Sequence, residues 1–93
     1  MGTINKRFKI GEIVWDTNNL CYGVVLNNYP DENYGEIRLD SDGNQPIEDL
    51  RKLGSNGDEG TDEDLKECLT SYERLVKNWP EYNYPKIINK PIK

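Results

Sequence analysis

Histidine is absent from this chain of 93 residues. Histidine is the commonest general base in enzymes and a frequent metal ligand, and its absence excludes Ser-His-Asp and Cys-His catalytic arrangements. A pair of carboxylates could still act as acid and base. The acidic residues, however, cluster in predicted loops, where solvation gives them no special reactivity. We therefore expect a protein that is not an enzyme and that needs no cofactor.

Cysteine occurs only as Cys21 and Cys68, far apart in the sequence. One such pair without histidine has neither metal-site spacing nor the density of a disulfide framework. We expect no metal and two reduced thiols, although the sequence leaves open whether they pair. No apolar run approaches the ~18 residues of a membrane-spanning helix, and the first residues show no signal-peptide core. We expect a cytoplasmic protein without membrane contact.

The acidic charge is concentrated in the middle of the chain. Residues 41–64 carry eight acidic and two basic side chains, and the whole chain has a net charge of −5. Such a segment repels phosphate, so nucleic acid is disfavoured as a partner. It offers instead a surface that could cover a basic partner. The acidic candidates for that surface are Asp40, Asp42, Asp58, Glu59, Asp62 and Glu63.

Residues 8–53 have the pattern of short β-strands separated by turns. Ile13 and Trp15 can share one face of a strand while Val14 lies on the other. Asn18 and Asn19 are typical turn residues, and Asp42-Gly43 is a strong hairpin signal. Four or five strands at this spacing predict a small antiparallel barrel.

Residues 61–79 predict one amphipathic helix. Thr61 or Asp62 can cap its start, acidic residues suit its first turn, and Pro80 ends it. Apolar residues recur at intervals of three and four. These are Leu65, Cys68, Leu69, Tyr72, Leu75, Val76 and Trp79.

The sequence as a whole predicts a single domain, residues 1–93, of the α+β class. Residues 54–60 are rich in glycine and predict a flexible linker between barrel and helix. The irregular tail, residues 80–93, contains Pro85 and Pro91 and several aromatic residues. We expect the tail to pack back on the barrel or helix, with Trp79, Tyr82 and Tyr84 covering the sheet, and residues 89–93 to fray.

Four stretches of residues 8–53 resemble SH3-like small β-barrels of the KOW and Tudor kind. They are "FKIGEIVW", "YGVVL", "GEIRLDSDG" and "IEDLRKL". The resemblance implies a binding module: KOW members bind RNA or proteins, and Tudor members hold methylated Lys or Arg in an aromatic cage. The helix and the tail have no counterpart in this resemblance.

The candidate residues for binding a protein or peptide are Trp15, Tyr22, Tyr29, Tyr34, Asp16 and Asp31. The aromatic rings would contact the partner and the carboxylates would face a cation. The alternative for Trp15 and Tyr22 is that they pack in or on the barrel.

Three functions follow from these patterns. The first is a protein-binding or peptide-binding module that uses barrel loops and exposed aromatic residues. The second is an acidic inhibitor, of the immunity-protein or nucleic-acid-mimic type, that covers a basic partner. The third is a KOW-like protein associated with nucleic acid. The sequence leaves a monomer and a weak homodimer both open.

We expect Tyr29→Ala combined with Tyr34→Ala to weaken binding of a protein partner without unfolding the domain. The affinity should be measured at low and high salt, because an acidic inhibitor loses affinity steeply with salt whereas an aromatic contact barely responds. Unchanged affinity in the double variant would rule out this pair as the contact.

Overall fold

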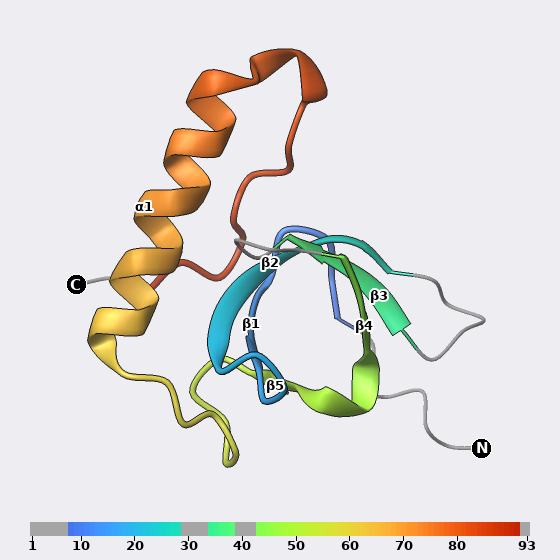
Figure 1. Cartoon of the computed structure of the whole chain (residues 1–93), viewed down its shortest axis with the longest axis vertical. Helices are drawn as coiled ribbons and strands as arrows, with labels where there is room; N and C mark the ends of the chain where they lie inside the picture. The colour runs from blue at the N-terminus through green and yellow to red at the C-terminus, as the bar shows by residue number, and fades with distance from the viewer. Residues whose placement is uncertain (1–7, 29–33, 39–42, 92–93) are drawn as a thin grey trace.

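A curved antiparallel sheet and one long helix form an α+β structure in the computed structural model (Figure 1). The structure describes residues 8–28, 34–38 and 43–91, and the side chains of residues 8–26 and 48–91. The strands are β1 (Ile13–Asp16), β2 (Cys21–Asn28), β3 (Tyr34–Arg38), β4 (Gly43–Pro46) and β5 (Leu50–Lys52). A 3-10 turn at Ile47–Asp49 lies between β4 and β5.

The five strands are ordered β4-β3-β2-β1-β5. The sheet is strongly curved (Figure 1), and a register shift between Val25 and Asn27 interrupts the pairing of β2 with β3. Such irregularities bend a strand and increase its twist. Strands β4 and β5 are the two edges, so the described strands form an open antiparallel sheet.

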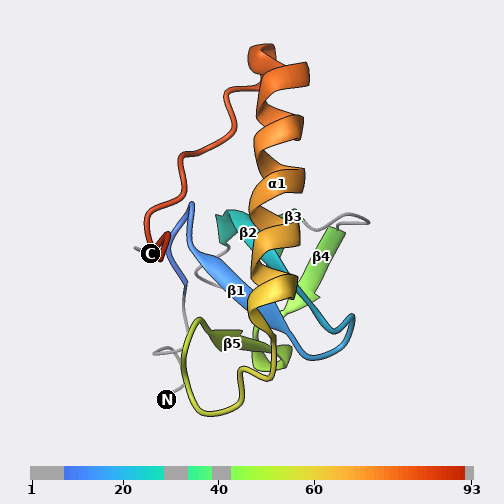
Figure 2. The same cartoon turned by 90° about the vertical axis from the view of Figure 1, so that its left-hand side faces the viewer.

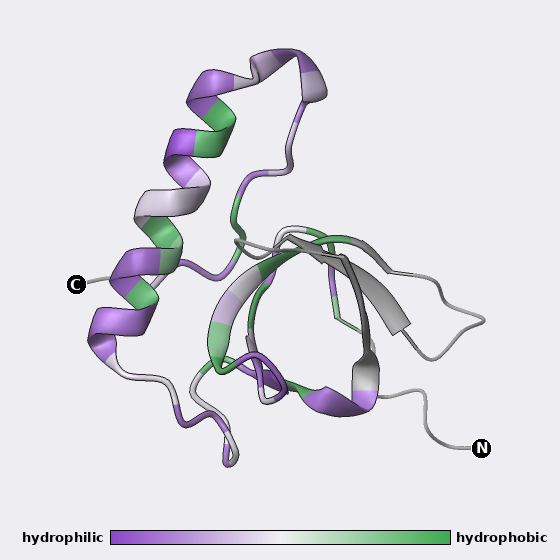
Figure 3. Ribbon diagram, in the orientation of Figure 1, coloured by the Kyte–Doolittle hydropathy of each residue, from purple (hydrophilic) through white to green (hydrophobic). Residues whose placement is uncertain are grey.

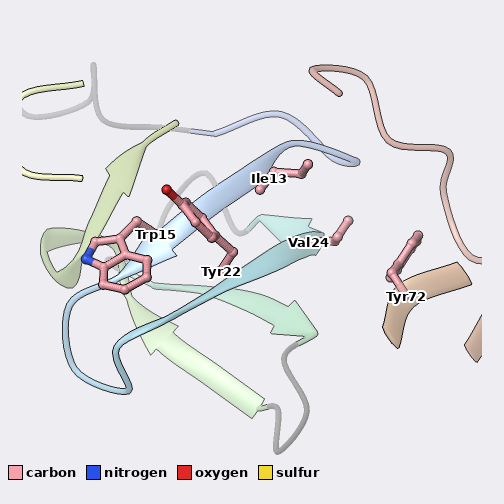
Figure 4. Close-up of a cluster of buried hydrophobic side chains, with 5 residues drawn as sticks. All are labelled: Ile13, Trp15, Tyr22, Val24 and Tyr72. Carbon is pink, nitrogen blue, oxygen red and sulfur yellow. The ribbon is translucent and has the colours of Figure 1, made fainter. Parts of the chain in front are cut away.

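Strand β1 is buried along its whole length because both of its faces are covered. Ile13 and Trp15 pack with Tyr22 and Val24 of β2 and with Tyr72 of the helix (Figure 4). On the opposite face, a second cluster is formed by Phe8, Val14, Val25 and Leu50. The expected division of β1 into two faces is confirmed.

Helix α1 (Asp62–Asn78) confirms the predicted amphipathic helix. Its start is a capping box: the Asp64 main-chain N–H donates to Thr61 Oγ1 at 3.1 Å, and the Thr61 N–H donates to Asp64 Oδ2 at 2.9 Å. Hydrophilic and hydrophobic residues alternate along α1 (Figure 3), and the helix lies beside β1 and β2 on the outer side of the sheet (Figures 1 and 2). Trp79 caps the end of the helix, and Pro80 begins a 3-10 turn, Pro80–Tyr82.

The tail returns from the end of α1 to the start of β1. The Tyr72 hydroxyl donates to the Pro85 carbonyl oxygen at 2.6 Å, and the Ile88 N–H donates to the Gly11 carbonyl oxygen at 3.0 Å. Gly11 has a φ of +93°, and a Cβ there would collide with the Lys86 carbonyl oxygen, so the contact requires glycine.

Asn89 anchors the tail with a pair of hydrogen bonds to one buried residue. Its Oδ1 accepts from the Ile13 N–H at 2.7 Å, and its Nδ2 donates to the Ile13 carbonyl oxygen at 3.2 Å. Residue 89, the first of the residues expected to fray, thus forms hydrogen bonds to β1. Trp79 and Tyr82, expected to cover the sheet, are instead 45% and 64% exposed.

We expect Asn89→Ala to lower the free energy of unfolding by about 1–3 kcal/mol, because the buried main-chain groups of Ile13 would lose both partners. Urea titration measures the loss. Asn78→Ala is the control, since Asn78 is exposed at the end of α1. Equal losses in the two variants would contradict this anchoring.

Candidate binding site between β2 and α1

The residues proposed from the sequence as an aromatic binding site are not gathered on one surface. Trp15 and Tyr22 are 3% and 6% exposed, with ring centroids 4.9 Å apart in an edge-to-face pair. They therefore pack in the core, as the alternative interpretation held, because α1 and the tail cover that face of the sheet. Tyr29 and Asp31 lie outside the described residues, and Tyr34 begins β3 with its side chain outside the described part.

Asp16, expected to face a cation, is fully buried. Its carboxylate accepts hydrogen bonds from the main-chain N–H groups of Asn18 and Asn19, at 2.8 and 3.2 Å, and from the Asn19 side-chain amide at 2.8 Å. The carboxylate therefore holds the β1–β2 turn and is turned away from any external ligand.

The segment 54–60, expected to be a flexible linker, forms a loop held by hydrogen bonds to Asp58. Asp58 accepts hydrogen bonds from the main-chain N–H groups of Gly54 and Gly60, at 2.8 and 2.9 Å. It also accepts one from the Tyr22 hydroxyl at 2.6 Å. A Cβ at Gly60 would collide with the Tyr22 ring, so the loop lies directly against the sheet.

The Tyr22 hydroxyl is held in its protonated form. Burial is the main cause that raises its pKa, followed by the hydrogen bond to Asp58 and the negative charges of Asp58, Asp64 and Asp62. Three carboxylates therefore lie close enough to place one phenol in a negative electrostatic environment.

A small pocket open to solvent lies between β2 and the first turns of α1. Its lining residues are Cys21, Tyr22, Asp64, Glu67 and Cys68. The two thiol groups are half-buried and are not joined in a disulfide. Asp64 and Glu67 lie three positions apart, on one face of the helix. The pocket thus combines Tyr22 and two cysteine residues with two carboxylates.

The carboxylates of the pocket have no basic counterpart in the fold as far as it is described. Among the described residues, no Lys or Arg forms an ion pair with Asp64 or Glu67. The ion pair found in that part of the chain joins Lys52 Nζ to Glu12 Oε2 at 2.9 Å. Glu67 is exposed and Asp64 half-buried. One oxygen of the Asp64 carboxylate accepts the Thr61 N–H in the capping box, and no described Lys or Arg neutralises either carboxylate.

The residues expected to form an acidic surface differ in exposure. Glu59, Asp62 and Glu63 are exposed, and Asp58 is half-buried in its loop. Asp40 and Asp42 lie outside the described residues.

Sequence reasoning missed the pocket, because it did not pair the start of β2 with the first turns of α1. The helical spacing of Asp64, Glu67 and Cys68 was available as a signal. The strand that faces these residues could not be identified from the sequence.

Neither a protein-family model, nor a curated protein, nor a solved structure matches this chain. Among the described residues, no group of three or more potential ligands is placed to hold a metal ion. No helix in that part of the chain combines the length and apolar character needed to cross a membrane.

We expect Tyr22→Phe to lower the free energy of unfolding at neutral pH by about 1.5–3 kcal/mol, because a buried hydrogen bond to a charged group is lost. Chemical denaturation measures this loss. Tyr82→Phe, which removes a hydroxyl from an exposed ring, is the control and should have little effect.

Tyr22→Phe should also change how the free energy of unfolding depends on pH in the alkaline range. The raised pKa of Tyr22 means that the folded protein keeps a proton that unfolded tyrosine loses near pH 10. This stabilisation is complete below about pH 10 and is lost as pH rises above it. Burial also raises the pKa of Tyr72, to about 12. Stability should fall above pH 10 less steeply in Tyr22→Phe than in the unmodified protein, and equal slopes would contradict this role of Tyr22.

Proposed function

We propose that this protein is a non-enzymatic binding module that recognises a protein or peptide through a basic side chain placed in the β2–α1 pocket. The observation that carries the proposal is the pair of carboxylates, Asp64 and Glu67, lining a pocket beside Tyr22 without an ion-pair partner among the described residues. A Lys or Arg side chain matches this chemistry, because its stem packs on apolar walls while its charged head meets carboxylates.

The SH3-like barrel is our proposal for the architecture that carries the pocket. Support comes from five antiparallel strands in one strongly curved sheet and from the 3-10 turn at Ile47–Asp49 before β5. SH3-like modules of the KOW and Tudor kind bind partners, which agrees with a binding function. The nucleic-acid role of KOW members fits this surface less well, since carboxylates repel phosphate.

A second candidate function is an acidic inhibitor that covers a basic partner. The observation in its favour is that Glu59, Asp62 and Glu63 are exposed just before and in the first turn of α1. The two functions differ in what the partner must supply. The pocket needs one basic side chain, whereas an inhibitor surface needs a broad basic patch.

We expect acetyl-arginine amide to shift the backbone amide NMR signals of Cys21, Tyr22 and the first turns of α1, with millimolar affinity. Acetyl-norleucine amide has a side chain of similar apolar character without the charge and should not produce these shifts. In Glu67→Gln the affinity should fall about two- to fivefold, the range of a solvent-exposed ion pair.

Glu73→Gln is the matched control, because Glu73 is an exposed acidic residue further along α1 and outside the pocket. Equal shifts with the neutral amide, or equal losses in the two variants, would overturn the pocket as the site. Shifts spread over residues 58–67 that vanish steeply with added salt would favour the acidic inhibitor.

A further inference from the structure

Two segments from opposite ends of the sequence lie side by side at the start of β1 (Figure 2). Residues 9–12 form a β-turn, closed by a main-chain hydrogen bond of 3.0 Å between its first and last residues. The tail, residues 86–90, crosses this turn at Gly11, where the Ile88 N–H donates to the Gly11 carbonyl oxygen. We call these two segments together the turn–tail surface.

Two isoleucine residues of the turn–tail surface are exposed. Ile10, the second residue of the turn, is 48% exposed, and Ile88 in the tail is 55% exposed. A Cβ at Gly11 would lie 3.3 Å from Ile88 Cγ2, so the Ile88 side chain rests on the turn itself. Single exposed apolar residues are ordinary in proteins. Two on adjoining segments, in a chain that is only 34% hydrophobic, favour a role in binding.

The same two segments carry positive charge that the fold does not neutralise. Lys9, Lys86 and Lys90 are exposed, and no carboxylate of the described residues forms an ion pair with any of them. The acidic side chain within these segments, Glu12, is buried and already engaged. Its Oε1 accepts a hydrogen bond from the Lys9 N–H, and its Oε2 pairs with Lys52 Nζ. The three lysines are therefore available to carboxylates from outside.

The turn–tail surface and the β2–α1 pocket lie at opposite ends of the β1–β2 hairpin. Ile13 pairs with Val24 at the end next to the turn 9–12, whereas Asp16 pairs with Cys21 at the other end, and Cys21 lines the pocket. The fold thus places uncompensated lysines and uncompensated carboxylates apart from each other. An inference about the lysine end does not depend on the function proposed for the pocket.

We propose that the turn–tail surface docks an acidic peptide segment of a partner protein, in which large apolar residues alternate with carboxylates. The carboxylates meet the exposed lysines, and an apolar side chain packs on Ile10 and Ile88. Charge complementarity sets the sign of the partner. The aliphatic side chains favour a peptide over nucleic acid, because bases stack on aromatic rings and neither segment contains an aromatic residue.

The probe is the peptide acetyl-Glu-Leu-Glu-Leu-Glu amide, titrated against the full chain by NMR. It should shift the backbone amide signals of residues 9–12 and 86–90 with millimolar affinity. Acetyl-Glu-Gly-Glu-Gly-Glu amide keeps the charge and should bind about fourfold more weakly, as expected from losing the burial of roughly one methylene group. In Ile10→Ser the difference between the two peptides should shrink to less than about twofold, while the glycine peptide still binds.

A pair of charge variants tests the lysines. Lys9→Gln combined with Lys90→Gln should weaken binding of the leucine peptide about four- to twentyfold, since each of two exposed ion pairs contributes about two- to fivefold. Lys66→Gln combined with Lys77→Gln is the matched control, because it removes the same charge from exposed positions of α1. The control should change the affinity by less than about twofold.

Each contrary outcome has a distinct meaning. Equal losses in the two double variants would show that the peptide responds to the net charge of the molecule, and would overturn the proposal. Equal affinities of the leucine and glycine peptides would overturn it as well, by removing the role of the isoleucines. A short oligothymidylate that binds the same residues more tightly than the leucine peptide would assign the surface to nucleic acid instead. The titration with acetyl-arginine amide reports on the pocket separately, so either proposal can fail alone.

Discussion

The hydrogen bond from Tyr22 to Asp58 joins the sheet to the segment that leads into α1, and the position of the helix depends on it. Asp58 also receives the N–H groups of Gly54 and Gly60, so one carboxylate shapes the whole turn before the helix cap. Because Gly60 has no side chain, this turn lies flat against the Tyr22 ring. The way α1 faces β2, and with it the pocket between them, follows from this contact.

The helix and the strands of the first half could be predicted because their signals are local. The helix is encoded by Thr61, Pro80 and the three-four spacing of apolar residues between them, and each signal acts within a few turns of the chain. The alternation of Ile13, Val14 and Trp15 likewise predicts two faces of a strand. The return of the tail to β1 was expected only in general terms, since the pairing of Asn89 with Ile13 joins residues at opposite ends of the sequence.

The roles of the aromatic residues could not be predicted, because burial depends on what covers a face. Trp15 and Tyr22 have the same local pattern whether their face of the sheet meets solvent or α1. In a chain with so little apolar content, the face of β1 and β2 beneath the helix needs large rings to fill it, and these two supply them. Among the side chains that the structure describes, the exposed rings of Trp79 and Tyr82 lie instead where the chain turns after the helix.

The acidic residues at the start of α1 are stabilised by the helix itself. Asp62, Glu63 and Asp64 lie in the first turn, where the positive end of the helix dipole stabilises carboxylates without a salt bridge. The fold therefore needs no lysine or arginine to balance them. Stabilisation by the helix itself leaves that negative charge available to a basic side chain from outside, as the proposed function requires.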